Sequence, residues 1–165
     1  MKRGLYWIFL AFLLFPGLCV AQDQRPSCVL LGAVDLKPLL GADHDALVEF
    51  GEASCRAETK AAGHRMVILT VTEQPRYELK NWLFAIKELT AKERAKEVTV
   101  SAEPELGPDA FSVSEKGERR EIEIYAIKGA KAVVVQGTWA IGGPVTDDDF
   151  KRLRQVAGSV LAKLP

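Results

Sequence analysis

The chain has 165 residues and carries 22 basic and 22 acidic residues, so its formal net charge at pH 7 is zero. This balance gives no electrostatic reason to expect nucleic acid, which selects a basic face, or a strongly anionic membrane as a partner. With 48% hydrophobic residues, the chain is long and apolar enough for one ordinary domain with a sizeable core.

The N-terminal segment has the layout of a secretory signal peptide. Lys2 and Arg3 precede an apolar run over residues 5–15, and Cys19 and Ala21 place small side chains before a cleavage point. The run is too short for a bilayer-spanning helix, which needs about 20 residues. We therefore expect cleavage after Ala21 and a periplasmic or secreted protein.

On this interpretation residues 1–21 are the signal peptide, and residues 22–165 form a single domain with no transmembrane span. Its two cysteines, Cys28 and Cys55, are an even pair, which in an oxidising compartment predicts one disulfide. Two free, buried thiols are the competing interpretation. Lipid attachment at Cys19, as in bacterial lipoproteins, is less favoured because a leucine rather than a small residue precedes that cysteine.

The first element expected after cleavage is a short N-terminal helix. Residues 22–27 are polar and predict an unstructured lead-in. Apolar residues then recur at roughly helical spacing, with Asp35 as a plausible N-cap and Gly41 as a C-terminal stop. Pro38 falls in the first turn of this helix, where proline is tolerated.

Strand patterns come next. Residues 46–49 and 53–59 predict two short strands, or one interrupted hairpin around Gly51. Residues 65–73 form the clearest strand of the first half. Because apolar side chains occupy both of its faces, we expect a central strand that is covered on both sides.

A long helix is expected over about residues 75–94, with Pro75 in its first turn. Its apolar residues follow the spacing of a single buried stripe. The members of this stripe are Leu79, Trp82, Leu83, Ile86 and Leu89.

Four more strands are expected over residues 97–102, 110–115, 121–127 and 132–140. The links between the last three are short, whereas a parallel crossover needs a dozen or more residues. The sequence therefore predicts a C-terminal three-strand antiparallel meander.

The last element is a helix that begins after Thr146. Asp149 follows three residues later, as in a capping box with Asp in place of Glu, and an apolar stripe continues to Leu164. Together these elements predict an α+β fold. It consists of an antiparallel sheet with the C-terminal meander, packed by two long helices and the short N-terminal helix.

Several short motifs resemble a family of uncharacterised extracytoplasmic bacterial domains, common among actinobacterial envelope lipoproteins. These motifs are Cys28 with Leu30-Leu31, Leu39-Leu40-Gly41, Cys55, and Leu106-Gly107-Pro108-Asp109-Ala110-Phe111. The resemblance implies an α/β/α sandwich similar to the photosystem PsbP-like fold, an envelope location and no catalytic residues. The chain departs from the family at the inserted Pro108 and at the lipidation signal.

Candidate chemistry is sparse. Asp43, His44 and Asp45 form the most conspicuous polar cluster, which we interpret as a surface turn rather than a metal site. His64 starts a strand with no obvious nucleophile beside it in the sequence. We expect no catalytic set, no metal site and no cofactor.

Two tryptophans are the candidate ligand-binding residues. Trp82 and Trp139 fall on apolar faces and could line a pocket between helix and sheet, although core packing is the favoured interpretation.

We therefore expect an exported, non-enzymatic binding or assembly domain, whose partner is another envelope protein or a small apolar ligand. One alternative is a small extracytoplasmic enzyme that uses His44 or His64. Another is a carrier that holds an apolar ligand between the sheet and the helix over residues 75–94.

Overall fold

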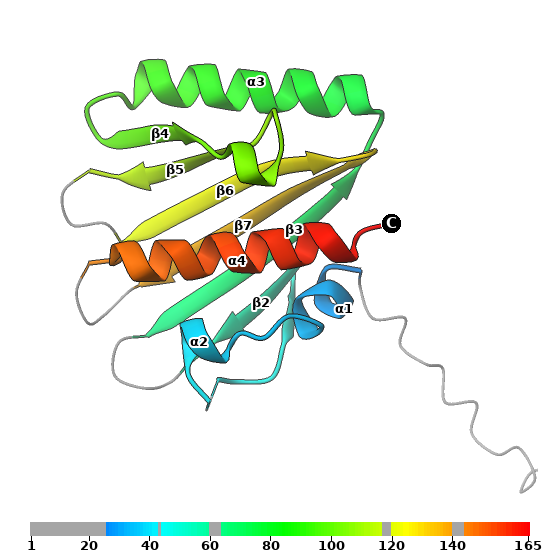
Figure 1. The fold of residues 1–165 in the computed structure, drawn as a ribbon, viewed down its shortest axis with the longest axis vertical. Helices are drawn as coiled ribbons and strands as arrows, with labels where there is room; N and C mark the ends of the chain where they lie inside the picture. Colours follow the sequence, from blue (N-terminus) through cyan, green and yellow to red (C-terminus); the bar gives the residue numbers. More distant parts are fainter. Residues whose placement is uncertain (1–25, 43, 60–63, 117–119, 140–143) are drawn as a thin grey trace, which may run out of the picture.

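The computed structural model describes residues 26–42, 44–59, 64–116, 120–139 and 144–165. Within these ranges the chain forms a seven-stranded antiparallel sheet with four α-helices (Figure 1), which confirms the expected α+β class. The strands are β1 (Val48–Phe50), β2 (Ser54–Glu58), β3 (Arg65–Glu73), β4 (Val98–Ala102), β5 (Phe111–Glu115), β6 (Glu121–Lys128) and β7 (Lys131–Trp139). The helices are α1 (Pro26–Gly32), α2 (Lys37–Leu40), α3 (Arg76–Glu93) and α4 (Asp147–Lys163), with a 3₁₀ turn η1 (Pro104–Leu106).

The strand order is β1-β2-β3-β7-β6-β5-β4. The expected meander of β5, β6 and β7 is confirmed, and β4 extends it by one more antiparallel strand. β3 then pairs along its length with β7, from Arg65 opposite Trp139 to Glu73 opposite Lys131. β1 and β2 continue the sheet as a hairpin, and Gly51 adopts a φ of +66° in its turn.

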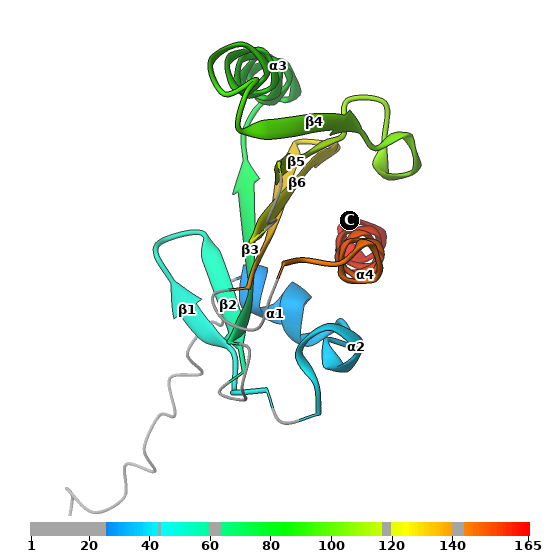
Figure 2. The ribbon, with the colours of Figure 1, turned by 90° about the vertical axis from the view of Figure 1, so that its left-hand side faces the viewer.

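Helices cover both faces of the sheet. Figure 2 shows α1, α2 and α4 on one face, whereas α3 packs on the other face over the half that contains β4, β5 and β6. The sheet is therefore the middle of three layers. The half of the second face formed by β2 and β3 keeps partly exposed side chains such as Arg56, Met66 and Thr70. β3 is therefore less completely covered than its sequence suggests.

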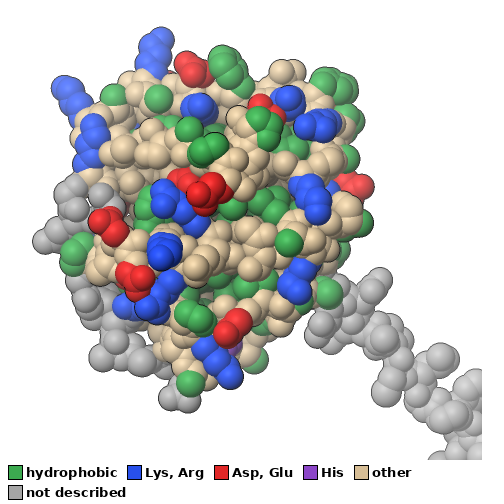
Figure 3. Space-filling model, viewed as in Figure 1, with side chains coloured by type: hydrophobic (Ala, Val, Ile, Leu, Met, Phe, Trp, Pro, Cys, Tyr) green, Lys and Arg blue, Asp and Glu red, His purple; other side chains and the backbone are tan. Residues whose placement is uncertain are grey.

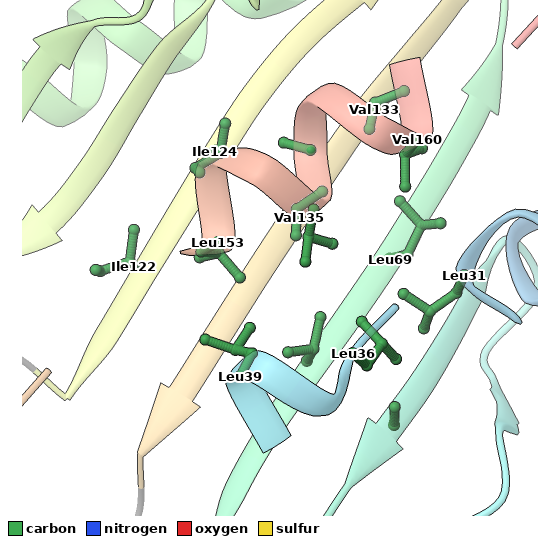
Figure 4. Close-up of a cluster of buried hydrophobic side chains, with 14 of the residues drawn as sticks. Leu31, Leu36, Leu39, Leu69, Ile122, Ile124, Val133, Val135, Leu153 and Val160 are labelled. Carbon is green, nitrogen blue, oxygen red and sulfur yellow. The ribbon is translucent and has the colours of Figure 1, made fainter. Parts of the chain in front are cut away.

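The larger core lies between the sheet and the three helices α1, α2 and α4. Leu31 of α1, Leu39 of α2 and Leu153 of α4 point toward the same sheet face (Figure 4) and are fully or almost fully buried. They meet the inward side chains of the central strands, among them Leu69 of β3 and Val135 of β7. Apolar burial of this kind stabilises a fold by roughly 25 cal/mol per Å², so this layer holds the sheet's centre in place.

The smaller core lies under α3. Leu83 of the helix packs with Val98, Phe111, Val113 and Tyr125 of the sheet. These five buried residues make a much smaller set than the opposite core, so α3 is attached by a narrow contact.

The Cys28–Cys55 disulfide is present, with a sulfur–sulfur distance of 2.06 Å. It joins α1 to β2 on the face that carries the larger core. The prediction of one disulfide is thus confirmed, and the interpretation as two free thiols is wrong.

The N-terminal part of the domain differs in detail from the expectation. Two short helices replace one, because α1 begins at Pro26, inside the expected lead-in. Cys28 and Leu31 of α1 are buried, so tertiary packing holds this turn of helix. Leu36 rather than Asp35 is the N-cap of α2, while the Asp35 carboxylate accepts a hydrogen bond from the backbone N–H two residues later.

The capping box of α4 is confirmed. The Asp149 backbone N–H donates to the Thr146 hydroxyl at 3.1 Å, and the Thr146 backbone N–H donates to the Asp149 carboxylate at 3.1 Å. The Arg65 guanidinium also donates to this carboxylate and to the backbone carbonyl of Leu39. One side chain of β3 therefore ties the end of α2 to the start of α4.

Candidate functional site

The most unusual surface of the molecule is the exposed side of α3. Its large apolar side chains are well exposed: Tyr77 by 66%, Phe84 by 65%, Leu89 by 54% and Trp82 by 40%. Across the described ranges seven large hydrophobic residues are exposed to this degree, and these four belong to one helix. Concentration of exposed apolar side chains marks an interaction surface more often than scattered single residues do.

The helix itself forms as the sequence predicts, but its buried stripe is narrower. α3 runs from Arg76 to Glu93, with Pro75 and Arg94 as its caps, close to the expected bounds. Leu79 and Leu83 are buried, whereas Trp82 and Leu89, which were expected in the same stripe, are exposed. The reason is the narrow core beneath the helix, which leaves the flank of the stripe uncovered.

Helix geometry sorts the exposed apolar side chains into two rows. With about 3.6 residues per turn, residues seven apart lie on the same side of a helix. Tyr77 and Phe84 form the row that points away from the sheet, and Trp82 and Leu89 form the row that flanks the buried stripe. Lysine and arginine side chains stand among the hydrophobic ones along this helix, at the top of Figure 3.

Trp82 touches the sheet through Tyr125. The two rings meet edge to face with their centroids 6.2 Å apart, and Tyr125 stacks on Phe111 at 4.8 Å. The Tyr125 hydroxyl donates a hydrogen bond of 2.8 Å to the Glu123 carboxylate. Burial, followed by the negative charge of Glu123, raises the pKa of the Tyr125 phenol well above its ordinary value, so this contact is a neutral phenol on a carboxylate.

A second acid lies beside that pair. Burial raises the pKa of Glu121, and the nearby charge of Glu123 raises it further, although a hydrogen bond from the Gln136 amide favours the ionised form. The small hollow next to these acids has a volume of about 40 Å³ and is lined by Arg94, Val98, Val113, Glu115, Glu121 and Glu123. It has room for only a few water molecules, so it is too small for a ligand.

Trp82 and Trp139 do not line a common pocket. Trp82 borders a hollow of about 180 Å³ with Thr72, Gln74 and Leu79. Trp139 lies on the opposite sheet face, where it is buried in the larger core and faces the guanidinium of Arg65 at 6.0 Å. Core packing, the favoured interpretation, therefore applies to Trp139.

The two histidines lie near β2. His64 Nε2 is 3.5 Å from a carboxylate oxygen of Glu58, and His44 Nδ1 lies 3.1 Å from the carbonyl oxygen of Gly41. The first pair supplies an acid and a base, but a nucleophile is not part of it. His44 also forms an isolated backbone bridge with Thr59, which suits its role in a turn. Asp43 lies outside the described residues.

A buried ionic cluster joins the start of η1 to α4, and no pattern in the sequence indicated it. The buried carboxylate of Glu103 accepts hydrogen bonds from the Ser112 hydroxyl at 2.7 Å and from the Arg154 guanidinium at 3.0 Å. A hollow of about 500 Å³ lies above this cluster, lined by Glu103, Glu105, Leu106, Lys151, Arg154, Gln155 and Gly158. Because Arg154 Nε lies 2.7 Å from a carboxylate oxygen of Glu103, the two form an ion pair, and we interpret the cluster as a structural link.

The exposed row of Tyr77 and Phe84 was also missed. In the sequence both residues fall outside the apolar stripe, on the side that lysine and glutamate otherwise occupy. Large apolar residues on the polar side of a helix were the available signal.

No group of three or more His, Cys, Asp or Glu side chains that could hold a metal ion occurs among the described residues. The same residues include no helix long and apolar enough to cross a membrane. Comparison with models of protein families, with curated proteins and with solved structures found no match. The family resemblance therefore stays a prediction.

Proposed function

We propose that this protein is an exported, non-enzymatic binding or assembly domain and that the exposed side of α3 is its contact surface. The observation that carries the proposal is the placement of Tyr77, Trp82, Phe84 and Leu89 on one helix that is held to the sheet by a narrow core. Exposed aromatic side chains supply large contact area with little rotamer entropy to lose, which is why binding surfaces are enriched in them.

Export is supported by two features. The pattern of residues 1–21 is that of a signal peptide, and a disulfide joins Cys28 to Cys55, a bond typical of oxidising compartments. Amino-terminal sequencing of the protein from its native host tests this part. We expect a mature chain that begins at Gln22, and recovery of the initiator methionine from cytosolic protein would contradict export.

A protein partner fits this surface better than a small apolar ligand does. The hollow beside Trp82 holds about 180 Å³, whereas ligand pockets occupy roughly 300–1,000 Å³. Tyr77 and Phe84 point away from the sheet, so they would contribute nothing to a ligand held beneath the helix. A broad contact uses both rows of α3.

Site-specific photo-crosslinking in the native host tests the contact surface. A benzophenone side chain replaces Phe84 in one variant and Phe50, an exposed aromatic residue of β1, in the control. We expect defined adducts from position 84 and none, or different ones, from position 50. Equal, diffuse labelling from both positions would reject α3 as the contact surface.

A further inference from the structure

The side of α3 that points away from the sheet has a palindromic pattern. Its members, which we call the outer strip, are Tyr77, Lys80, Phe84, Glu88 and Ala91, and all five are exposed. They are separated by three, four, four and three residues, which are the spacings of side-chain ridges on a helix. Phe84 is the centre of the pattern, with one lysine four residues before it and one glutamate four residues after it.

We propose that the outer strip binds the outer strip of a second copy of this chain, as an antiparallel helix pair with its two-fold axis at Phe84. The inference rests on the proposed function and names a partner for the row that points away from the sheet. In a two-fold interface, residues equally far from the axis in opposite directions meet. Phe84 then meets its own copy, Lys80 meets Glu88 of the second copy, and Tyr77 meets Ala91 of the second copy.

Each of these contacts is favourable by its own chemistry. The two phenyl rings bury each other at the axis, where hot-spot residues concentrate. Lysine and glutamate have opposite charges, and the symmetry makes the pair twice. The large tyrosine ring lies over the small alanine side chain, so bulk and space also match. Size is matched between Tyr77 and Ala91, and charge is matched between Lys80 and Glu88, around the same centre. We therefore take a second copy of the strip as the partner.

The charge of α3 also favours a second copy of the chain over a lipid surface. A helix that lies on an anionic bilayer carries lysine and arginine on its polar side. The outer strip has one lysine and one glutamate, and α3 as a whole has four basic and three acidic residues, Arg76, Lys80, Lys87 and Lys92 against Glu78, Glu88 and Glu93. A helix with nearly equal numbers of basic and acidic side chains can pair its charges with those of a second copy of itself.

Lys80 is available for the contact. Its ammonium lies 3.1 Å from the Asp109 carboxylate, but both side chains are well exposed, by 46% and 37%. Exposed ion pairs of this kind contribute little, about 0–1 kcal/mol. The lysine can therefore turn toward a second carboxylate at small cost.

The expected dimer is reversible. One helix pair buries less than the 1,200–2,000 Å² or so of a standard stable interface. We expect a monomer in dilute solution and a dimer only at high protein concentration, because small interfaces form transient complexes.

Sedimentation velocity with two single charge reversals tests the inference. Lys80→Glu leaves two acidic groups on the strip and Glu88→Lys leaves two basic groups, so each variant alone faces two like-charge contacts. We expect each to dimerise at least ~10-fold more weakly than the wild type, where tenfold corresponds to 1.4 kcal/mol. Mixed one to one, the two variants are expected to form a heterodimer as tightly as the wild type dimerises. Asp109→Asn is the control for the exposed bridge and keeps the wild-type affinity.

Four results would overturn the inference. A wild type that stays monomeric at millimolar concentration excludes the second copy. A wild-type dimer that both reversals leave intact, or a mixture that stays monomeric, places the dimer contact elsewhere. Flotation of a monomeric wild type with vesicles of phosphatidylglycerol and phosphatidylcholine would assign the strip to a lipid surface.

The crosslinking and sedimentation results together distinguish this inference from the proposed function. If crosslinking from position 84 captures a different protein while the purified chain stays monomeric, the contact surface stands and the second copy is wrong. If position 84 gives no specific adduct and the chain stays monomeric, both fail.

Discussion

The absence of a side chain at Gly137 leaves space for the indole ring of Trp139. Gly137 lies on β7 two residues before Trp139, on the same sheet face, and a Cβ at Gly137 would approach the Trp139 ring to 2.5 Å and Leu153 Cδ2 to 3.1 Å. Such a contact forces the tryptophan or α4 to move. Glycine is thus required here by close packing, although it weakens a strand elsewhere.

We expect Gly137→Ala to lower the free energy of unfolding by about 1–3 kcal/mol, the usual cost of overpacking a core. Urea unfolding followed by tryptophan fluorescence measures the change. The control is Gly158→Ala in α4, where the new Cβ meets only Leu106 Cδ2 at 3.6 Å. Because alanine favours a helix over glycine by about 1 kcal/mol, the control should be neutral or more stable. Destabilisation of both variants to the same extent would contradict this account of Gly137.

Glu121 makes stability depend on pH. Its pKa is raised in the folded protein, first by burial and then by Glu123. A raised pKa means that the folded state binds the proton more tightly than the unfolded state does, so stability is lost as pH rises through the folded value. We expect Glu121→Gln to be more stable than the wild type at pH 7, with a difference that shrinks toward pH 4. Denaturant unfolding across this range measures it, and a variant that is less stable at pH 7 by a constant amount would show that the Gln136 hydrogen bond dominates.

At the scale of single elements, α4 depends on its first turn. Thr146 and Asp149 satisfy each other's backbone N–H groups, and the three acids Asp147, Asp148 and Asp149 stand at the positive end of the helix dipole. We expect Thr146→Ala to cost about 1 kcal/mol in the free energy of unfolding, whereas Thr146→Ser, which keeps the hydroxyl, costs much less. Equal stability of the two variants in chemical denaturation would show that the cap is dispensable.

Most of the correct sequence predictions concern single helices and neighbouring strands. The bounds of α3, the capping box of α4 and the β5–β7 meander follow from local patterns, so they were predictable. The exposure of Trp82 and Leu89 was not predictable, because a helical repeat gives the direction of an apolar stripe but not its width. The width depends on how many strands lie beneath the helix, which is a tertiary property. The exposed row of Tyr77 and Phe84 is different, because the placement of both residues on the polar side of the helix was visible in the sequence and was missed.

At the scale of the whole molecule, the pairing of β3 with β7 could not be predicted. The two strands are separated in the chain by α3 and three further strands, and nothing local specifies which edge of the meander β3 joins. The ionic link of Glu103 with Arg154 depends on the same tertiary arrangement. The disulfide was predictable because the cysteine count and the expected compartment sufficed.

The disulfide is expected to contribute to the stability of the whole fold. It closes a loop with a sequence separation of 27 residues, for which chain entropy predicts about 3.5 kcal/mol. Reduction of the native protein should therefore lower its free energy of unfolding by about that amount. The double variant Cys28→Ala with Cys55→Ala is the control and should not respond to reductant. An unchanged unfolding curve of the wild type in reductant would contradict this contribution.

The central claim is that the exposed side of α3 is covered when the protein works. Hydroxyl-radical labelling of the protein in intact cells of its native host, compared with the dilute purified protein, tests it most directly because Phe50 of β1 serves as an internal reference. We predict that oxidation of Tyr77 and Phe84 falls severalfold in the cells while oxidation of Phe50 does not change. If Phe84 is oxidised to the same extent in both samples, α3 is free in the working protein and the account is wrong.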